Sequence, residues 1–314
     1  MELRQLRHFL AVVDGESLGD AARKLDMSQP ALSKSIQALE QSVGVPLFTR
    51  SRRGMRLNQS GRALMTRARS MTLEAERAAA EIREIEGTQR GRIVVGTSSS
   101  FASVVLPAAI ERFRAKYPQF EIVVVEDSPV RFGPRIETGD FDFAFGSLTP
   151  SFAARGLEQE VMAERERVLV VTSPQNPLAA GGRVSVKELW AGPWLMSPDP
   201  YIRSRLNEIF LRYNLPPPEA AVVYSTVILA KQLLQRGNYL LMLGECQVYD
   251  DVGRGTLSIV NTQDLVWERS IGAIFRAPLT AAAQILLAET REVFATYHRA
   301  IRDGRKRNAG RAAS

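Results

Sequence analysis

Four side chains able to hydrogen-bond with nucleic-acid bases or phosphates recur within SQPALSKSIQALEQSV, residues 28–43. They are Gln29, Ser33, Lys34 and Gln37, and at about 3.6 residues per turn they share one broad face of a helix. Amide and hydroxyl groups suit base edges in a DNA major groove, and a lysine suits a phosphate. A solvated helix face is the alternative explanation of this pattern.

The apolar residues of the same segment predict the helix that would carry these side chains. They recur at steps of four, three and four, and they form a stripe roughly 120° from the polar face. Ser28 can cap the helix, Pro30 suits its first turn, and Gly44 can end it in the left-handed conformation. We therefore expect a helix from Gln29 to Val43, buried through Leu32, Ile36, Leu39 and Val43.

The flanking sequence predicts a winged helix-turn-helix. A first helix is expected from about Leu3 to Val13, and a second, capped by Ser17, carries Ala21, Ala22 and Leu25. Downstream, TRSRRGMRLN (residues 49–58) is typical of a two-stranded wing, and no acidic residue occurs from 41 through 73. Basic residues in this position indicate phosphate contacts. The wing arginines are Arg50, Arg52, Arg53 and Arg56.

A long helix is expected from Ser60 to about Thr88. Apolar residues recur there at alternating steps of four and three, which is the heptad pattern of a coiled coil. We interpret this as a dimer seam, and an amphipathic helix lying on a neighbouring element is the alternative. The seam residues are Leu64, Ala68, Met71, Ala75, Ala78, Ile82 and Ile85.

Charge separates the chain of 314 residues into three parts. Residues 1–92 hold 16 Lys and Arg against 11 Asp and Glu, residues 93–298 hold 19 against 22, and residues 299–314 hold 6 against 1. The formal net charge of +7 is therefore concentrated at the two ends. A polyanionic partner is indicated for the N-terminal part. The tail, residues 303–314, is predicted to be disordered and solvated, with DNA contact as the alternative.

Several functional classes find no support in the sequence. Gly15 to Gly19 matches the G-x-S-x-G pattern of hydrolases, but it joins two helices instead of following a strand. Cys246 is the single cysteine, and with His8 and His298 it cannot form a plausible zinc site, so no catalytic residue, metal or cofactor is predicted. The N-terminus lacks a signal-peptide core and no apolar run is long enough to span a membrane, so we expect a cytoplasmic protein.

Beyond residues 87–91, strand and helix patterns alternate, which indicates an α/β domain of two lobes. The chain is expected to cross between the lobes near Glu164 and return near Glu268, and a cleft between such lobes commonly binds a small ligand. Strands are expected at 92–96, 121–126, 142–145, 167–172, 194–196, 221–224, 239–243, 257–260 and 271–276, and helices at 103–116, 130–138, 186–189, 201–213, 226–235 and 280–302.

Residues 1–66, with the SQPALSKSIQALE core and the PLFTRSRRGM wing, strongly resemble the N-terminus of LysR-type transcriptional regulators. Phrases such as LPAAIERFRAKYP and VLVVTSPQNPL extend a looser resemblance to about residue 300. The resemblance implies a winged helix-turn-helix (1–59), a dimerising linker helix (60–91) and a periplasmic-binding-protein-like, Rossmann-like effector domain (92–302). Lobe I would comprise 92–163 and 268–302, and lobe II would comprise 164–267.

The resemblance also implies promoter DNA, RNA polymerase and other copies of the chain as partners, in a dimer or tetramer. A small inducer in the cleft would alter how the assembly bends DNA. The DNA-binding residues would be Gln29, Pro30, Ser33, Lys34, Gln37, Arg50, Arg52 and Arg53. Inducer contacts would be Ser98, Ser99, Ser100, Phe101, Ser128, Tyr201, Ile202, Arg203 and Thr226.

The hydroxyls near Gly96 and the fork of Arg203 suit an anionic organic acid as the inducer. Ordinary helix capping and a surface ion pair are the alternatives for these side chains. Two further functions are weighed. A solute-binding protein is disfavoured, because the sequence lacks a signal peptide and such a protein would leave the first 90 residues unexplained. An architectural DNA binder with an unresponsive C-terminal domain stays open.

Overall fold

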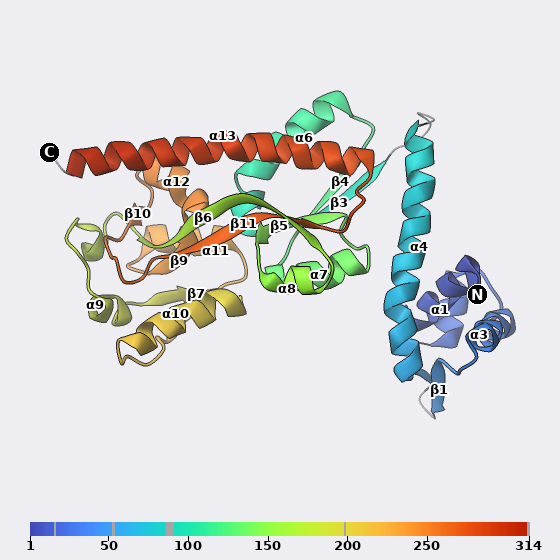
Figure 1. Ribbon diagram of the computed structural model, residues 1–314. Coiled ribbons are helices and arrows are strands. Elements are labelled where there is room, and N and C mark those ends of the chain that lie inside the picture. The colour runs from blue at the N-terminus through green and yellow to red at the C-terminus, as the bar shows by residue number, and fades with distance from the viewer. Residues whose placement is uncertain (16, 52–53, 86–90, 198, 313–314) are drawn as a thin grey trace.

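The computed structural model describes residues 1–15, 17–51, 54–85, 91–197 and 199–312. Figure 1 shows a small helical unit at the N-terminus, a long helix α4 beside it, and a larger α/β part beyond α4. The expected organisation into a helix-turn-helix, a linker helix and an α/β region with two lobes is confirmed at the level of secondary structure.

The N-terminal unit packs three helices, α1 (Leu3–Asp14), α2 (Leu18–Lys24) and α3 (Gln29–Val43), around one apolar core. The predicted caps are present: Ser17 accepts from the Asp20 N–H, Ser28 accepts from the Ala31 N–H, and Gly44 ends α3 with φ of 82°. The wing pairs β1 (Phe48–Ser51) with β2 (Gly54–Leu57) in an antiparallel ladder. The bounds of α3 therefore match the prediction from its caps and apolar spacing, but Val43, which was expected to be buried, is 38% exposed in the last turn of the helix.

Helix α4 (Gln59–Ile85) packs along α1, which corrects part of the predicted seam. Ala68 is completely buried in the core of the N-terminal unit, and Leu64 packs against the same core. The sequence pattern did not distinguish these intramolecular contacts from a seam, because both use the same heptad spacing. Farther along, Met71 (44% exposed) and Ile82 (62% exposed) remain uncovered. Ala78 is also exposed, Ala75 is half-buried, and the Ile85 side chain lies outside the described part.

Two close approaches fix α4 in place. A Cβ atom on Gly61 would lie 2.2 Å from the Leu47 carbonyl oxygen, so only glycine fits where α4 meets the start of the wing. At the other side of α4, the Leu73 side chain packs against Gly139, and Arg276 Nη1 donates to Ser70 Oγ at 3.3 Å. The linker helix thus contacts both the DNA-binding unit and the α/β region.

The α/β region is built on a sheet with the strand order β10-β6-β11-β5-β3-β4, to which β9 adds beside β6. Strands β3 (Arg92–Thr97), β4 (Glu121–Glu126) and β5 (Phe143–Ser147) run parallel and belong to lobe I. Strands β9 (Leu241–Gly244) and β10 (Ser258–Ile259) belong to lobe II, as does the β7–β8 pair (Trp194–Met196 and Ala220–Val223).

Two long strands connect the lobes. Strands β6 (Glu158–Thr172) and β11 (Trp267–Phe275) are antiparallel partners that run through both lobes, as Figure 1 shows. Glu164 lies within β6 and Glu268 lies within β11, so the expected crossing points fall on these strands. Strand β6 begins at Glu158, well before the expected strand at 167–172. The reason is that EQEVMAERER is too highly charged to read as a buried strand.

Helices cover both faces of this sheet. Lobe I carries α5 (Ser99–Ala102), α6 (Val105–Lys116), α7 (Pro129–Glu137) and α8 (Pro150–Ala154). Lobe II carries α9 (Val186–Trp190), α10 (Pro200–Arg212), α11 (Val227–Arg236) and α12 (Glu245–Gly253). Helix α12 was not predicted, because ECQVYDDVG has few apolar residues and follows a strand without a turn signal.

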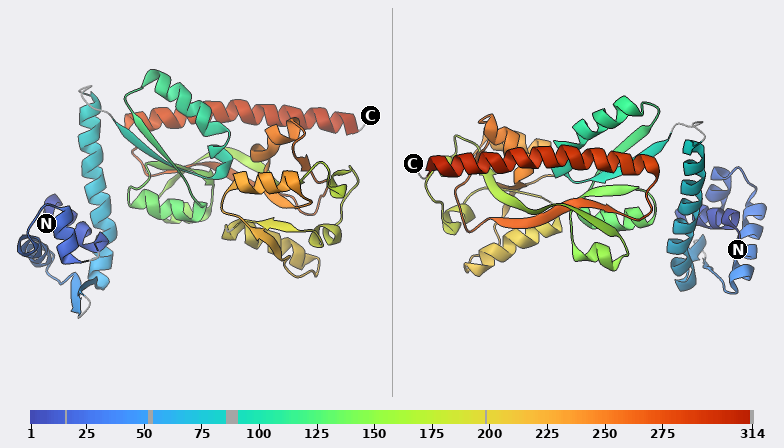
Figure 2. Two further views of the ribbon diagram at one scale, coloured as in Figure 1. Left: turned by 180° about the vertical axis from the view of Figure 1, so that it is seen from behind. Right: turned by 45° about the horizontal axis from the view of Figure 1, so that its top comes forward.

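Helix α13 (Ala281–Ala312) lies along one side of both lobes, as the views in Figure 2 agree. It continues through residues 303–312, so the prediction of a disordered tail is wrong for these residues. Their sequence, DGRKRNAGRA, is polar but rich in residues with good helix propensity, and cations suit a helix C-terminus. Low apolar content therefore does not by itself indicate disorder.

Candidate functional site

The polar face of α3 is open to solvent. Gln29, Pro30, Lys34 and Gln37 are exposed and Ser33 is half-buried, whereas Leu32, Ile36 and Leu39 on the other side are buried. The predicted DNA-facing residues are therefore separated from the core as the periodicity required. Nothing in the described part of the chain covers the side chain of Gln37.

Two polar contacts orient α3 and the wing. His8 Nδ1 on α1 lies 2.8 Å from Ser35 Oγ on α3, and burial, together with the nearby charge of Arg4, lowers the pKa of His8. At the end of α3, Glu40 Oε1 accepts from the backbone N–H groups of Leu47 (2.7 Å) and Phe48 (3.3 Å). A carboxylate on the recognition helix thus holds the first strand of the wing, which sequence reasoning did not identify.

The wing arginines are placed only in part. Arg56 is exposed on β2 and pairs in register with Thr49, while Arg50 pairs with Met55. The side chain of Arg50 and all of Arg52 and Arg53 lie outside the described residues. Their contacts with phosphate stay a prediction from the sequence.

A cleft of about 720 Å³ lies between the two lobes. This is within the range of roughly 300–1,000 Å³ that is usual for small-molecule sites. Six of the nine predicted inducer contacts line it. They are Ser98, Ser99, Ser100, Ser128, Tyr201 and Ile202.

The other three predicted inducer contacts do not line this cleft. Phe101 is 1% exposed and stacks on Phe145 and Phe294 in the lobe I core. Arg203 is exposed and is absent from the cleft lining, but it lines a small adjacent hollow together with Ile202 and Tyr224. The hydroxyl of Thr226 caps α11 by accepting from the Leu229 N–H. The capping alternative therefore holds for Thr226.

Arg269 supplies the buried positive charge of the cleft. Its Nε donates to Glu166 Oε2 at 2.6 Å, and its Nη1 and Nη2 donate to Ser147 and Ser100, each at 3.1 Å. Arg269 and Glu166 face each other on the two crossover strands, with side-chain exposures of 11% and 1%. Sequence reasoning missed this pair, because nothing local marks one arginine among many as buried.

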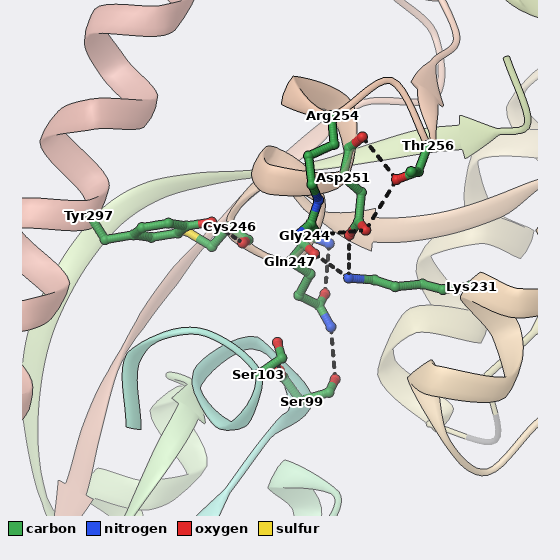
Figure 3. Close-up of polar contacts among 10 residues, drawn as sticks. All are labelled: Ser99, Ser103, Lys231, Gly244, Cys246, Gln247, Asp251, Arg254, Thr256 and Tyr297. Atoms are coloured by element: carbon green, nitrogen blue, oxygen red, sulfur yellow. Dashed lines mark hydrogen bonds and ion pairs between the residues drawn. The ribbon is translucent and has the colours of Figure 1, made fainter. Parts of the chain in front are cut away.

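Two hydrogen bonds cross the cleft between the lobes. Gln247 Nε2 on α12 donates to Ser99 Oγ at 2.8 Å, as Figure 3 shows. Nearer the mouth, Ser128 Oγ donates to Asp199 Oδ2 at 3.2 Å. Ser99 and Ser128 belong to lobe I, while Gln247 and Asp199 follow strands of lobe II. Two of the predicted inducer contacts are therefore already bonded to the opposite lobe.

Burial shifts two further ionisable groups of the cleft toward their neutral forms. Burial raises the pKa of Glu126 and raises the pKa of Tyr224 to about 12, and both residues line the cleft. Cys246 lies behind the cleft on α12, where burial raises the pKa of its thiol. A protonated, buried thiol is a poor nucleophile.

Over the described residues, no group of three or more His, Cys, Asp and Glu side chains could hold a metal ion. In the same part of the chain, every helix is too short or too polar to cross a membrane.

Comparisons with known proteins identify the family of both parts of the chain. Residues 3–62 match the family model described as "Bacterial regulatory helix-turn-helix protein, lysR family", and residues 86–295 match the LysR substrate binding domain. The chain is 25% identical over 294 residues to the regulator GbpR of Azospirillum brasilense, covering 93% of this chain and 86% of that protein. It is 30% identical over 227 residues to a probable cat1 operon transcriptional activator of Acinetobacter lwoffii, covering 71% and 74%.

A solved structure shares the fold along almost the whole chain. The structure of ArgP from Mycobacterium tuberculosis superposes with a TM-score of 0.69 at 17% identity, covering 92% of this chain and 96% of that one. The exposed face of α3, the inter-lobe cleft and the two family matches lead to one conclusion: the chain belongs to the LysR family of transcriptional regulators, which bind DNA and an effector, and it is not an enzyme.

Proposed function

We propose that this regulator binds promoter DNA as an oligomer and changes transcription when a small organic acid enters the inter-lobe cleft. The observation that carries the DNA part is the exposed polar face of α3, which lies opposite the buried stripe of the same helix. Residues 1–59 would bind DNA, residues 60–91 would join two chains, and residues 92–302 would bind the effector in the cytoplasm. RNA polymerase would be recruited or excluded by the resulting change in DNA bending.

The organic-acid proposal rests on the donor groups of the cleft. Arg269 directs Nη1 and Nη2 toward hydroxyls of Ser147 and Ser100, all three of which line the cleft. A guanidinium binds a carboxylate through two parallel hydrogen bonds. Glu166 balances the charge of Arg269, so a carboxylate would gain chiefly from hydrogen bonds and from the surrounding hydroxyls. Arg269 thus replaces Arg203 as the residue that would recognise the acid.

Footprinting of the DNA that flanks the chain's own gene tests the DNA part. We expect protection of an interrupted palindrome, because two copies of α3 would enter successive major grooves. Repeating the footprint with a metabolite panel tests the effector part. A footprint that no metabolite alters would favour an architectural DNA binder.

Calorimetry with matched probes tests the ligand class. Benzoate and benzamide share a shape but differ in charge, as do other acids and their amides. Binding confined to acids, and lost in Arg269→Lys, supports the proposal. Tight binding only of neutral sugars or of cations would contradict it.

Light scattering tests the oligomer. Ile82 is 62% exposed on α4, on the part of the predicted seam that the chain's own core leaves uncovered. Ile82→Asp would place a charge in an apolar helix–helix contact, and we expect the mass of the assembly to fall. Arg67→Asp, a charge change at an exposed site on the same helix outside the seam, is the control. An unchanged mass for Ile82→Asp would contradict the seam.

A further inference from the structure

The two hydrogen bonds across the cleft involve hydroxyls that a ligand would need. Ser99 Oγ accepts from Gln247 Nε2, and Ser128 Oγ donates to Asp199 Oδ2. All four residues line the cleft. A ligand that hydrogen-bonds to Ser99 or Ser128 therefore competes with a contact between the lobes.

Gln247 is itself held firmly on the lobe II side. Its Oε1 accepts from the Gly244 N–H at 2.9 Å, where β9 ends and α12 begins. Its backbone carbonyl accepts from Lys231 Nζ, which also bonds to Asp251 Oδ2 at 2.7 Å (Figure 3). Because both ends of the side chain amide are bonded, the amide has one defined orientation and presents its N–H group to Ser99.

The side of the cleft behind α12 is closed by packing. Cys246 belongs to the core of lobe I, and Val248 on the same helix belongs to a core of lobe II. Tyr297 Oη donates to the Cys246 carbonyl at 3.1 Å, and Tyr249 Oη donates to the Ala300 carbonyl at 3.0 Å, which ties α12 to α13. These contacts join α12 to α13, whereas the bonds of Ser99 and Ser128 join hydroxyls of lobe I to groups that follow strands of lobe II.

Asp199 is also held in a defined orientation, by a hydrogen bond at the start of α10. Its Oδ1 accepts from the Tyr201 N–H at 2.8 Å as the cap of α10, which leaves Oδ2 directed at Ser128. Both cross-cleft bonds thus join a fixed group on lobe II to a hydroxyl on lobe I.

We propose that Gln247 and Asp199 are positioning residues that hold the two lobes together through Ser99 and Ser128, and that a ligand separates the lobes by taking over these hydroxyls. The proposal rests on the proposed effector function of the cleft. These two bonds reduce the apparent affinity for such a ligand, since part of the binding free energy is used to break them. Weakening either bond makes opening easier.

Electron-spin distance measurements on the full-length chain test the closed state without any ligand. Cysteines introduced at Ala153 on α8 and Leu211 on α10 are exposed and lie on opposite lobes, whereas the native Cys246 is buried. Dilution with unlabelled chain restricts the measured pairs to single chains. Ser99→Ala and Ser128→Ala should each raise the open-to-closed ratio by roughly twofold to tenfold, the range for one ordinary hydrogen bond.

Ser103→Ala is the matched control. Ser103 lies near Ser99, but its hydroxyl donates to the Ser99 backbone carbonyl at 2.8 Å and lies outside the cleft lining. We expect its distance distribution to match that of the unaltered chain. The proposal is overturned if the double variant Ser99→Ala/Ser128→Ala also keeps the parent distribution.

DNA footprinting provides a second measurement, which should not change if Gln247 and Ser99 only stabilise the fold. Without added ligand, Gln247→Ala and Ser99→Ala should shift the footprint in the same direction, and the double variant should shift it no further than either alone. Equal footprints for folded single variants and the parent would contradict the proposal. If the parent gives no footprint at all, the proposed function fails, while the distance measurement still decides whether the bonds hold the lobes together.

Discussion

Helix α3 and the inter-lobe cleft differ in how far their polar side chains are exposed and already hydrogen-bonded. The predicted DNA-facing residues lie on one helix face, within nine positions of one another, and Gln37 is exposed. The cleft residues come from several separate elements, and Ser99 and Ser128 are already hydrogen-bonded across the lobes. The proposed DNA surface is therefore open to solvent, whereas the proposed ligand site is a cleft in which several polar groups already have partners.

This difference predicts which substitutions should alter binding alone and which should also alter stability. Substitutions on the face of α3 should alter DNA binding and leave stability nearly unchanged. Substitutions in the cleft should alter stability as well as binding, because each cleft group also satisfies another buried group.

The largest effect is expected for Arg269→Ala. This change leaves the Glu166 carboxylate buried at 1% exposure without its cation, and removing one partner of a buried pair typically costs about 3–5 kcal/mol. Chemical unfolding of the full chain measures it. Arg269→Met together with Glu166→Gln removes both charges and should cost less than Arg269→Ala alone. A loss below about 1 kcal/mol for Arg269→Ala would mean that the pair is more solvated than its burial indicates.

The next effect is expected for Gln37→Ala on cognate DNA. Loss of a base contact should weaken binding to the footprinted site by about 1–3 kcal/mol and leave binding to random DNA unchanged. Unfolding should change by no more than about 0.5 kcal/mol, because the side chain is exposed. Ser33→Ala should behave in the same way. Equal losses on cognate and random DNA would remove these residues from base recognition.

A smaller and less selective effect is expected for Lys34→Ala. If Lys34 contacts phosphate, binding to every sequence should weaken, and the slope of log K against log salt should fall by about 1. Measurements of affinity across a salt series distinguish this from Gln37→Ala, whose salt slope should stay at the parent value. An unchanged slope for Lys34→Ala would assign the lysine to solvent.

The smallest effect is expected for the pH dependence of the unfolding free energy that His8 contributes. Burial lowers the pKa of His8 in the folded chain from the ordinary value of 6.5, so the folded state binds the proton less readily than the unfolded state. The contribution of His8 to stability is therefore present above pH 6.5 and is lost as the pH falls below it. Unfolding at several pH values should show a decline between pH 7 and pH 5 that is shallower in His8→Gln. Identical declines would contradict the shift.

The same comparison explains what could be predicted from the sequence. Helix α3 was predicted to the residue, because its cap, its proline, its stripe and its terminal glycine are local signals. Most strands of the lobes were placed within a few residues, because buried β-branched runs are also local. The Arg269–Glu166 pair and the bonds of Gln247 and Asp199 depend on how distant elements meet, which no spacing in one chain reveals.

The errors have the same origin. Ala68 fits a heptad seam, yet tertiary packing against α1 buries it inside the chain. Arg203 was chosen for its chemistry, but the direction of its side chain depends on where α10 lies relative to the cleft. Residue type and spacing were sufficient to predict which segments carry the functional side chains. The contact partner of each side chain could be identified only from the three-dimensional structure.

The most direct test of this account is the affinity of the full-length chain for its footprinted site and for a scrambled duplex, measured for the parent and for Gln37→Ala. The account predicts that the parent prefers the footprinted site and that Gln37→Ala loses roughly tenfold or more of that preference while folding normally. A parent chain that binds both duplexes equally, or a folded Gln37→Ala variant that keeps the full preference, would contradict the assignment of α3 as the helix that reads DNA.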